Sequence, residues 1–118
     1  MGKPIAQHQL ISATLADMET KCETARLLLY KCGQMIDDGV DGSELTKISA
    51  MAKLYCTDVA MDVTTDAVQI LGGYGYMQEY PVERMMRDAK ITQIYEGTNQ
   101  VQRIVMARQL LDGVQSRL

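Results

Sequence analysis

One acidic residue in this sequence has neighbours suited to chemistry. Glu96 lies in the run IYEGTNQ, residues 94–100, with Ile94 and Tyr95 before it and Gly97 after it. A carboxylate on a loop among apolar side chains can act as a general base, and a glycine beside it leaves room for a substrate. A Glu just before a helix can also serve only to complement the helix dipole. The residue types alone leave both interpretations open.

A second candidate is the glycine-rich run GGYGY at residues 72–76. Gly72 and Gly73 allow the backbone to approach a ligand closely and leave N–H groups free for an anion. The spacing does not make the GxGxxG dinucleotide fingerprint, because these glycines follow a predicted helix rather than a strand. A helix stop followed by a packed aromatic loop also explains the run.

The histidine and cysteine residues give no sign of a metal site. His8 is the only histidine, so metal ligation is not expected, and the pattern alone predicts a solvated residue at a helix start. The odd cysteine count and the absence of a CxxC pair argue against both a disulfide framework and a zinc site. We expect free, buried thiols at the three cysteines, Cys22, Cys32 and Cys56.

Composition and charge predict a globular chain that binds neither nucleic acid nor membrane. Its 118 residues are 47% hydrophobic and 23% charged. Twelve Lys and Arg against 15 Asp and Glu give a net charge of −3, and the basic residues are scattered singly, without the patch that nucleic acid requires. No apolar run approaches the ~18 residues of a membrane span. Charged residues such as Asp58 and Asp62 are expected on solvated faces.

The hydrophobic pattern predicts two long helices. Apolar or small residues recur at alternating steps of four and three from Ile11 to Ile36, which predicts a helix over residues 4–38 with Pro4 in its first turn. A turn rich in Gly and Asp follows. A second stripe predicts a helix that starts at Ser43 as N-cap and ends at the Gly72–Gly73 pair.

The C-terminal part is predicted to be less regular. Its run of Gly and Tyr favours an ordered loop, and its last apolar stripe favours a helix with Thr98 as N-cap and Gly113 as its stop. The predicted order is a loop over 72–82, a short helix over 82–87, a loop over 88–98 and a helix over 99–112.

These elements predict one all-α domain over residues 1–118, an antiparallel up-and-down helical bundle. Two helices of about 30 residues present more apolar surface than one 14-residue helix can cover. The bundle is therefore expected to be incomplete in this chain, and another surface must complete its core.

Three runs resemble the acyl-CoA dehydrogenase family. Residues 66–111, from DAVQILGGYGYMQEYPVERMMRDAK to ITQIYEGTNQVQRIVMARQLL, are similar to the C-terminal end of its C-terminal helical domain. GKPIAQHQLISATLADM, residues 2–18, and AMAKLYCTDVA, residues 50–60, resemble earlier parts of that domain. The resemblance covers the whole chain in the right order.

The resemblance implies an FAD-dependent oxidoreductase of fatty acid β-oxidation. Such flavoproteins have an N-terminal helical domain, a middle β-domain and a C-terminal four-helix bundle, and they assemble as homotetramers or dimers. They oxidise an acyl-CoA to the trans-2-enoyl-CoA and pass electrons to an electron-transfer flavoprotein. The Glu of the family's YEGT motif, here Glu96, removes the α-proton while a hydride passes to flavin N5. Hydrogen bonds to the thioester carbonyl stabilise the developing charge.

The resemblance also implies roles for other residues. Tyr95 lines the acyl pocket and Gly97 lies beside the acyl-CoA, while the run QILGG reaches the FAD of a neighbouring subunit. The residues implied to contact FAD are His8, Gln9, Gln69, Ile70, Leu71, Gly72, Gly73, Thr98, Asn99 and Gln100. No metal is implied.

The sequence departs from the family at its start. The family's Arg-x-x-Phe-Gly-x-Pro motif is met here only from its Gly, which implies a fragment without the first bundle helix, the β-domain and the N-terminal domain. We therefore expect the isolated chain to be inactive. The alternative is a non-catalytic helical oligomerisation or interaction module derived from the family. The expected location is a bacterial cytoplasm or the mitochondrial matrix.

Overall fold

The computed structural model describes residues 2–117, and these residues are helical with no strand. The prediction of an all-α fold is confirmed. In chain order the elements are the 3-10 helix η1 (Ile5–Gln7), α1 (Gln9–Asp37), α2 (Gly42–Leu71), α3 (Gly73–Tyr76), α4 (Val82–Thr92) and α5 (Asn99–Gln115).

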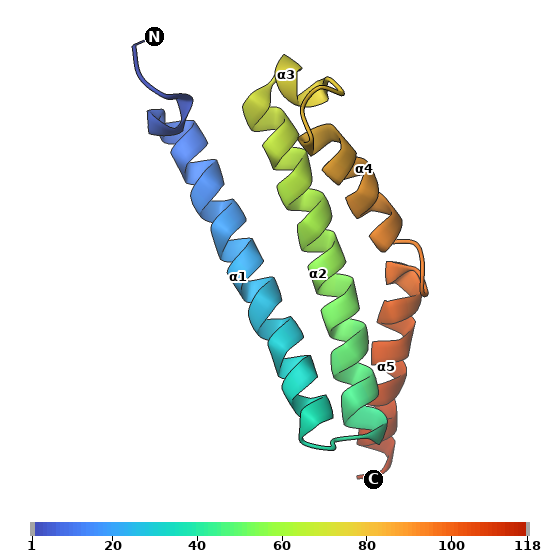
Figure 1. The fold of residues 1–118 in the computed structure, drawn as a ribbon. Helices are drawn as coiled ribbons and strands as arrows, with labels where there is room; N and C mark the ends of the chain where they lie inside the picture. Colours follow the sequence, from blue (N-terminus) through green and yellow to red (C-terminus); the bar gives the residue numbers. More distant parts are fainter. Residues whose placement is uncertain (1, 118) are drawn as a thin grey trace.

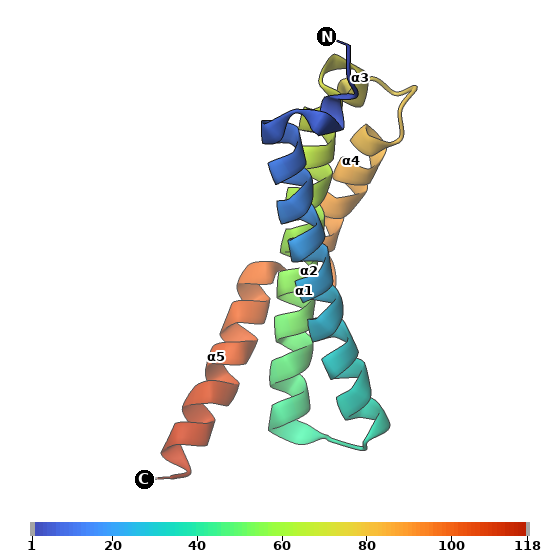
Figure 2. The same ribbon diagram turned by 90° about the vertical axis from the view of Figure 1, so that its left-hand side faces the viewer.

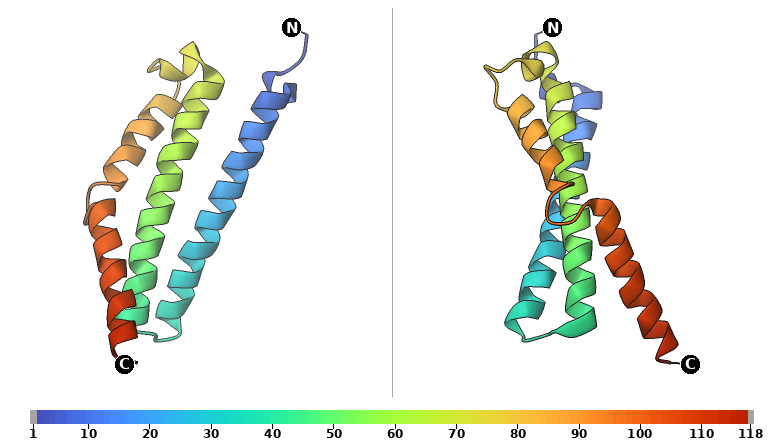
Figure 3. Two further views of the ribbon diagram at one scale, coloured as in Figure 1. Left: turned by 180° about the vertical axis from the view of Figure 1, so that it is seen from behind. Right: turned by 90° about the vertical axis from the view of Figure 1, so that its right-hand side faces the viewer.

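The helix α2 lies at the centre of the arrangement (Figure 1). α1 runs antiparallel to α2 on one side, and α4 followed by α5 runs antiparallel to α2 on the other. Among the described elements, α1 packs only on α2 and η1. α5 leans out of the layer formed by α1 and α2 toward its C-terminal end (Figure 2, Figure 3). α4 and α5 together therefore take the place of a third bundle helix. The turn between them faces the middle of α2.

Three predictions are wrong: the start of the first long helix, the start of the second long helix, and the loop at the GGYGY run. α1 begins at Gln9 and not at Pro4, because the extended backbone of His8 (φ −80°, ψ 132°) separates it from η1. α2 begins after Asp41, so Ser43 lies inside its first turn and is not the N-cap. The predicted loop starts with the helical turn α3, in which Gly75 packs on α2.

Two predicted boundaries in the C-terminal part are also wrong. α4 continues to Thr92, because Ala89 is buried against α2 and this packing favours the helix beyond residue 87. α5 continues through Gly113 to Gln115, since a glycine inside a helix costs only about 1 kcal/mol. The predicted start of this helix after Thr98 is confirmed.

Gly75 lets α3 fold back closely onto the end of α2. A Cβ at this position would lie 2.6 Å from the backbone oxygen of Val68 and 3.0 Å from Leu71 Cβ. The reversal itself takes place at Gly72, whose φ of 59° is in the left-handed region. The glycine run therefore ends α2 and allows α3 to pack closely against it.

The core is small and consists mainly of short side chains. Cys32, Ile48 and Ala52 form its buried cluster between α1 and α2. No large side chain of the described residues is completely buried. The radius of gyration is 18.1 Å, against about 13.5 Å for a compact domain of this length. The described chain therefore leaves much of its apolar surface uncovered, as the sequence predicted.

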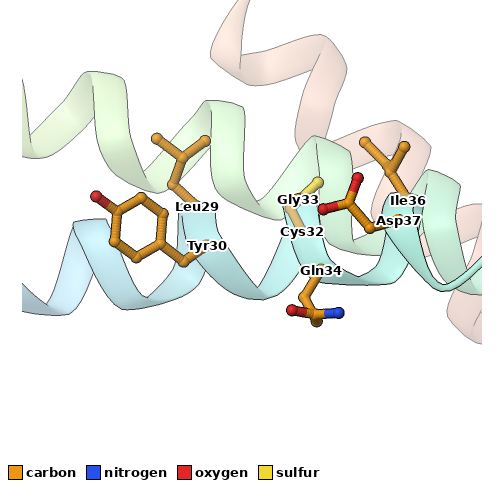
Figure 4. A pocket seen from close by; sticks show the side chains of 7 residues that line it. All are labelled: Leu29, Tyr30, Cys32, Gly33, Gln34, Ile36 and Asp37. Carbon is orange, nitrogen blue, oxygen red and sulfur yellow. The ribbon is translucent and has the colours of Figure 1, made fainter.

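The uncovered surface includes a shallow groove along the C-terminal part of α1. It has a volume of about 570 Å³ and runs from Leu29 to Asp37 (Figure 4). Leu29 and Tyr30 are 54% and 66% exposed. Within residues 2–117, none of the helices combines the length and apolarity needed to cross a membrane.

Candidate active site

The turn between α4 and α5 has an unusual backbone. Glu96 has a φ of 55°, and it is the non-glycine residue in the described chain with a positive φ. Gly97 follows with a φ of 86°. A left-handed conformation costs a non-glycine residue about 1–2 kcal/mol. Such a conformation persists only where neighbouring groups hold it.

Two side chains hold the backbone oxygens of this turn. Lys53 Nζ, on α2, donates to Gly97 O at 2.8 Å and to Asn99 Oδ1 at 2.7 Å. Gln102 Nε2, on α5, lies 3.2 Å from both Glu96 O and Gly97 O. The turn is thereby attached to α2 and to the first part of α5.

Asn99 joins the turn to α2 from the other side. It is buried, and its Nδ2 donates to Thr57 Oγ1 at 2.8 Å and to Asp58 Oδ1 at 2.7 Å. Its backbone N–H donates to Gln93 O at 3.0 Å. Gln93 Nε2 in turn donates to the same Asp58 Oδ1 at 2.8 Å. Both ends of the turn are therefore connected to one carboxylate of α2.

The start of α5 is capped as the sequence predicted. Thr98 Oγ1 accepts from the backbone N–H of Val101 at 3.2 Å. Thr98, Asn99 and Gln100 line a depression of about 310 Å³, which Arg103 and Asp58 also border. Arg103 Nη2 lies 3.6 Å from Asp58 Oδ2, so this depression contains paired charges beside the positive end of a helix dipole.

The Glu96 side chain is free to meet a ligand. Within residues 2–117 its carboxylate makes no hydrogen bond or ion pair, and only its backbone oxygen is bonded. It borders a groove of about 470 Å³ between α2 and α5, to which Lys53 and Gln102 also belong. Tyr95, next to it, is 52% exposed.

The predicted site residues fall into two separate groups. Tyr95 to Gln100 lie at the turn against the middle of α2. His8 and Gln9, at the start of α1, and Gln69 to Gly73, at the end of α2, lie at the end of the molecule that carries the N-terminus and α3 (Figure 1). At 1.5 Å per residue, α2 separates Asp58 from Gly72 by about 20 Å. One small ligand cannot contact both groups within this chain.

The residues that hold the turn are not among those that the sequence predicts for the site. Asp58 was expected on a solvated face with Asp62, and this expectation is wrong, because Asp58 is half-buried and accepts bonds from Asn99 and Gln93. Lys53 and Thr57 are one helical turn apart in a helix that is otherwise largely apolar on its packed faces. The polar Lys53 and Thr57 were the signal in the sequence for a contact at this face of α2. Only the tertiary structure shows that the turn and Asn99 are their partners.

Other titratable groups lie outside this site. Burial raises the pKa of the Cys56 thiol. A hydrogen bond from Arg87 lowers the pKa of the half-buried Glu83 carboxyl on α4. Cys32 is buried, Cys22 and Cys56 are half-buried, and all three are free thiols. In the described part of the chain no group of His, Cys, Asp and Glu is placed to hold a metal ion.

The fold and the turn together define an all-α bundle domain that presents an unpaired carboxylate at a helix junction. A family model described as acyl-CoA dehydrogenase, C-terminal domain, matches residues 1–111. The chain therefore belongs to the acyl-CoA dehydrogenase family and corresponds to its C-terminal helical domain.

Individual relatives agree with this assignment. Cyclohexane-1-carbonyl-CoA dehydrogenase of Geobacter metallireducens is 54% identical over 110 residues, which cover 93% of this chain and 28% of the relative. Butyryl-CoA dehydrogenase from Megasphaera elsdenii matches with a TM-score of 0.89 and 55% identity over 94% of this chain and 28% of that one.

A chain in the structure of the electron transferring flavoprotein of Acidaminococcus fermentans also matches, with a TM-score of 0.89 and 54% identity over 94% of this chain and 28% of that one. The present sequence thus spans about 28% of the length of the relatives it matches.

Proposed function

We propose that this chain is part of an FAD-dependent acyl-CoA dehydrogenase in which Glu96 is the base that removes the α-proton. The observation that carries this proposal is the placement of Glu96. Its carboxylate is exposed and unpaired within the described residues, while the backbone that bears it is held by Lys53 and Gln102. A general base must reach its proton without competing partners and from a fixed position.

The chemistry assigned to this chain is one proton transfer. A carboxylate oxygen of Glu96 accepts the α-proton of the acyl thioester as the C–H bond breaks, and the electron pair of that bond forms the α,β double bond. Bound FAD supplies the acceptor, at N5, for the hydride that leaves the β-carbon. Gly97 leaves space beside the thioester, and Tyr95 forms part of the wall of the acyl pocket. The product is the trans-2-enoyl-CoA.

The donors near the turn fit FAD. Thr98 and Gln100 present an uncharged hydroxyl and an uncharged amide at the N-terminus of a 17-residue helix, which favours a polar or anionic ligand. Asn99 lies between them, but its side chain is buried and bonded to α2. We assign to Asn99 the positioning of these two neighbours and a contact with FAD only through its backbone.

We assign the second group of residues to a different FAD molecule from the one at the turn. Gly72 lies about 20 Å from Asp58 along α2, and His8 and Gln9 precede and begin α1 at the same end of the molecule. Gly72 and Gly73 have open space where a Cβ would project, so a ligand can approach their backbone. We propose that this group contacts FAD bound mainly by a neighbouring subunit, in a homotetramer or homodimer.

The proposed partners follow from the family. They are an acyl-CoA substrate and an electron-transfer flavoprotein that receives the electrons. The match to a chain in the structure of the electron transferring flavoprotein of Acidaminococcus fermentans supports the second. A bacterial cytoplasm or the mitochondrial matrix is the proposed location, because reducing compartments keep the three cysteines as thiols.

The proposal is tested with the full-length protein under anaerobic conditions. Addition of an acyl-CoA substrate is expected to bleach the visible absorbance of bound FAD and to yield the enoyl-CoA in equal amount. A flavoprotein whose absorbance is unchanged by any of a series of straight, branched and cyclic acyl-CoAs would contradict the proposed reaction.

The exposed apolar residues of α1 favour a second candidate, a non-catalytic helical interaction module. Leu27, Leu29 and Tyr30 are each more than half exposed. On either proposal the 118-residue chain is expected to self-associate, because burial of apolar surface contributes about 25 cal/mol per Å². Sedimentation at micromolar concentration should show dimers or larger species. A stable monomer would argue against this surface as an interface, and only the bleaching experiment separates the two candidates.

A further inference from the structure

We propose that Lys53 is a positioning residue for the base, and that its ammonium group sets the backbone conformation from which Glu96 acts. This inference rests on the proposed function of Glu96. Lys53 is on α2, 43 residues before Glu96 in the sequence, and it does not belong to the turn that it holds.

The geometry points to two hydrogen bonds from Lys53 that hold the C-terminal end of the turn in place. Lys53 Nζ donates to Gly97 O at 2.8 Å and to Asn99 Oδ1 at 2.7 Å, so one ammonium group bonds the residues on both sides of Thr98. Hydrogen bonds from a charged donor are about twice as strong as neutral ones. The bond to Gly97 O fixes the peptide plane between Gly97 and Thr98, one residue after Glu96.

The charge of Lys53 is balanced through Asn99. The amide of Asn99 directs its oxygen to Lys53 and its nitrogen to Asp58, at 2.7 Å in each case. The opposite charges of Lys53 and Asp58 therefore orient the amide between them, and they do so on the half-buried face of α2. An uncharged residue at position 53 would leave Asn99 Oδ1 without this donor and Gly97 O with only the longer bond from Gln102.

The left-handed backbone conformation of Glu96 makes these two bonds from Lys53 necessary. Its φ of 55° is unfavourable for a residue with a side chain, so without Lys53 the turn can relax toward a right-handed conformation. Relaxation moves the carboxylate relative to the substrate α-carbon. A displacement of about 1 Å can cost about 10²-fold in rate. Tyr95 and Gly97 form only part of the proposed acyl pocket, so the loss is expected mainly in kcat, with a much smaller change in KM.

The test uses the full-length flavoprotein with Lys53→Met, which keeps most of the unbranched side chain and removes the donors. We expect kcat to fall about 10-fold to 100-fold, with KM for the acyl-CoA and the flavin content close to wild type. Lys47→Met is the matched control, because Lys47 is on the same helix and, among residues 2–117, its ammonium group pairs only with Glu44. Its kcat should equal that of the wild type.

A double-mutant cycle distinguishes positioning from a general structural role. If Lys53 acts through Glu96, Lys53→Met should change the residual rate of Glu96→Gln by less than about twofold, because the base is already absent. An equal loss in both backgrounds, or a wild-type kcat in the single variant, overturns the proposal. If Lys53→Met yields no folded flavoprotein, Lys53→Leu, which also has no hydrogen-bond donor, decides by the same criteria. If Glu96→Gln alone retains full activity, the proposed function of Glu96 fails, whatever Lys53→Met does.

Discussion

Glu96→Gln in the full-length protein is expected to lower the rate of acyl-CoA oxidation by about 10³–10⁴-fold while FAD stays bound. Positioned general bases contribute about 10²–10⁴-fold, and here the base must remove a proton from carbon, so we expect the upper part of that range. The amide has nearly the size of the carboxylate but cannot accept the proton. The carboxylate makes no bond within the described chain, so its replacement should not disturb the fold.

The measurement is the anaerobic rate of flavin bleaching by the acyl-CoA, together with the flavin content of the purified variant. Glu19→Gln is the matched control, since Glu19 is exposed on α1 away from the turn. A Glu96→Gln variant that bleaches at the wild-type rate would remove Glu96 from the mechanism. A variant that loses its flavin would assign Glu96 to cofactor binding instead.

Asn99→Ala is expected to destabilise the protein by about 2–4 kcal/mol. The substitution removes the donors to Thr57 and Asp58 and the acceptor of Lys53, all in a half-buried environment. Leaving buried polar groups without partners costs about 1–3 kcal/mol each, and more where a charge is involved. The buried position of Asn99 leaves little room for water to replace the amide.

Urea denaturation followed by circular dichroism measures this loss as a change in the free energy of unfolding. Arg108→Ala is the control on the same helix, because Arg108 is exposed. Its effect should stay within about 0.5 kcal/mol. An Asn99→Ala variant as stable as the control would show that the hydrogen bonds of Asn99 contribute little to the attachment of α5.

Much of the fold could be predicted from the sequence because it depends on local patterns. The helical period between Ile11 and Ile36 requires only that one face of one helix be apolar. The start of α5 at Thr98 is also local, since a threonine hydroxyl accepts from an N–H three residues on. The two long helices have more apolar surface than the remaining helix can cover. This follows from the predicted helix lengths alone, and the extended shape confirms it.

The boundaries that failed depend on contacts with distant residues. Residues 88–92 have no strong helical signal of their own, but Ala89 is buried against α2 and the helix continues. Gly75 reads as a loop residue in isolation, and its close approach to Val68 makes it part of a packed turn. In both cases a tertiary contact outweighs a weak local preference.

The candidate site divides in the same way. The sequence by itself determined the carboxylate, its glycine neighbour and the helix that follows, because all of these lie within residues 94–100. Only the tertiary structure decided how the carboxylate is held. Lys53 and Asp58 meet the turn across more than 30 residues of chain, and no local pattern encodes which face of α2 the turn will contact. The physical reason is that hydrogen bonds between distant segments form only once packing has brought those segments together.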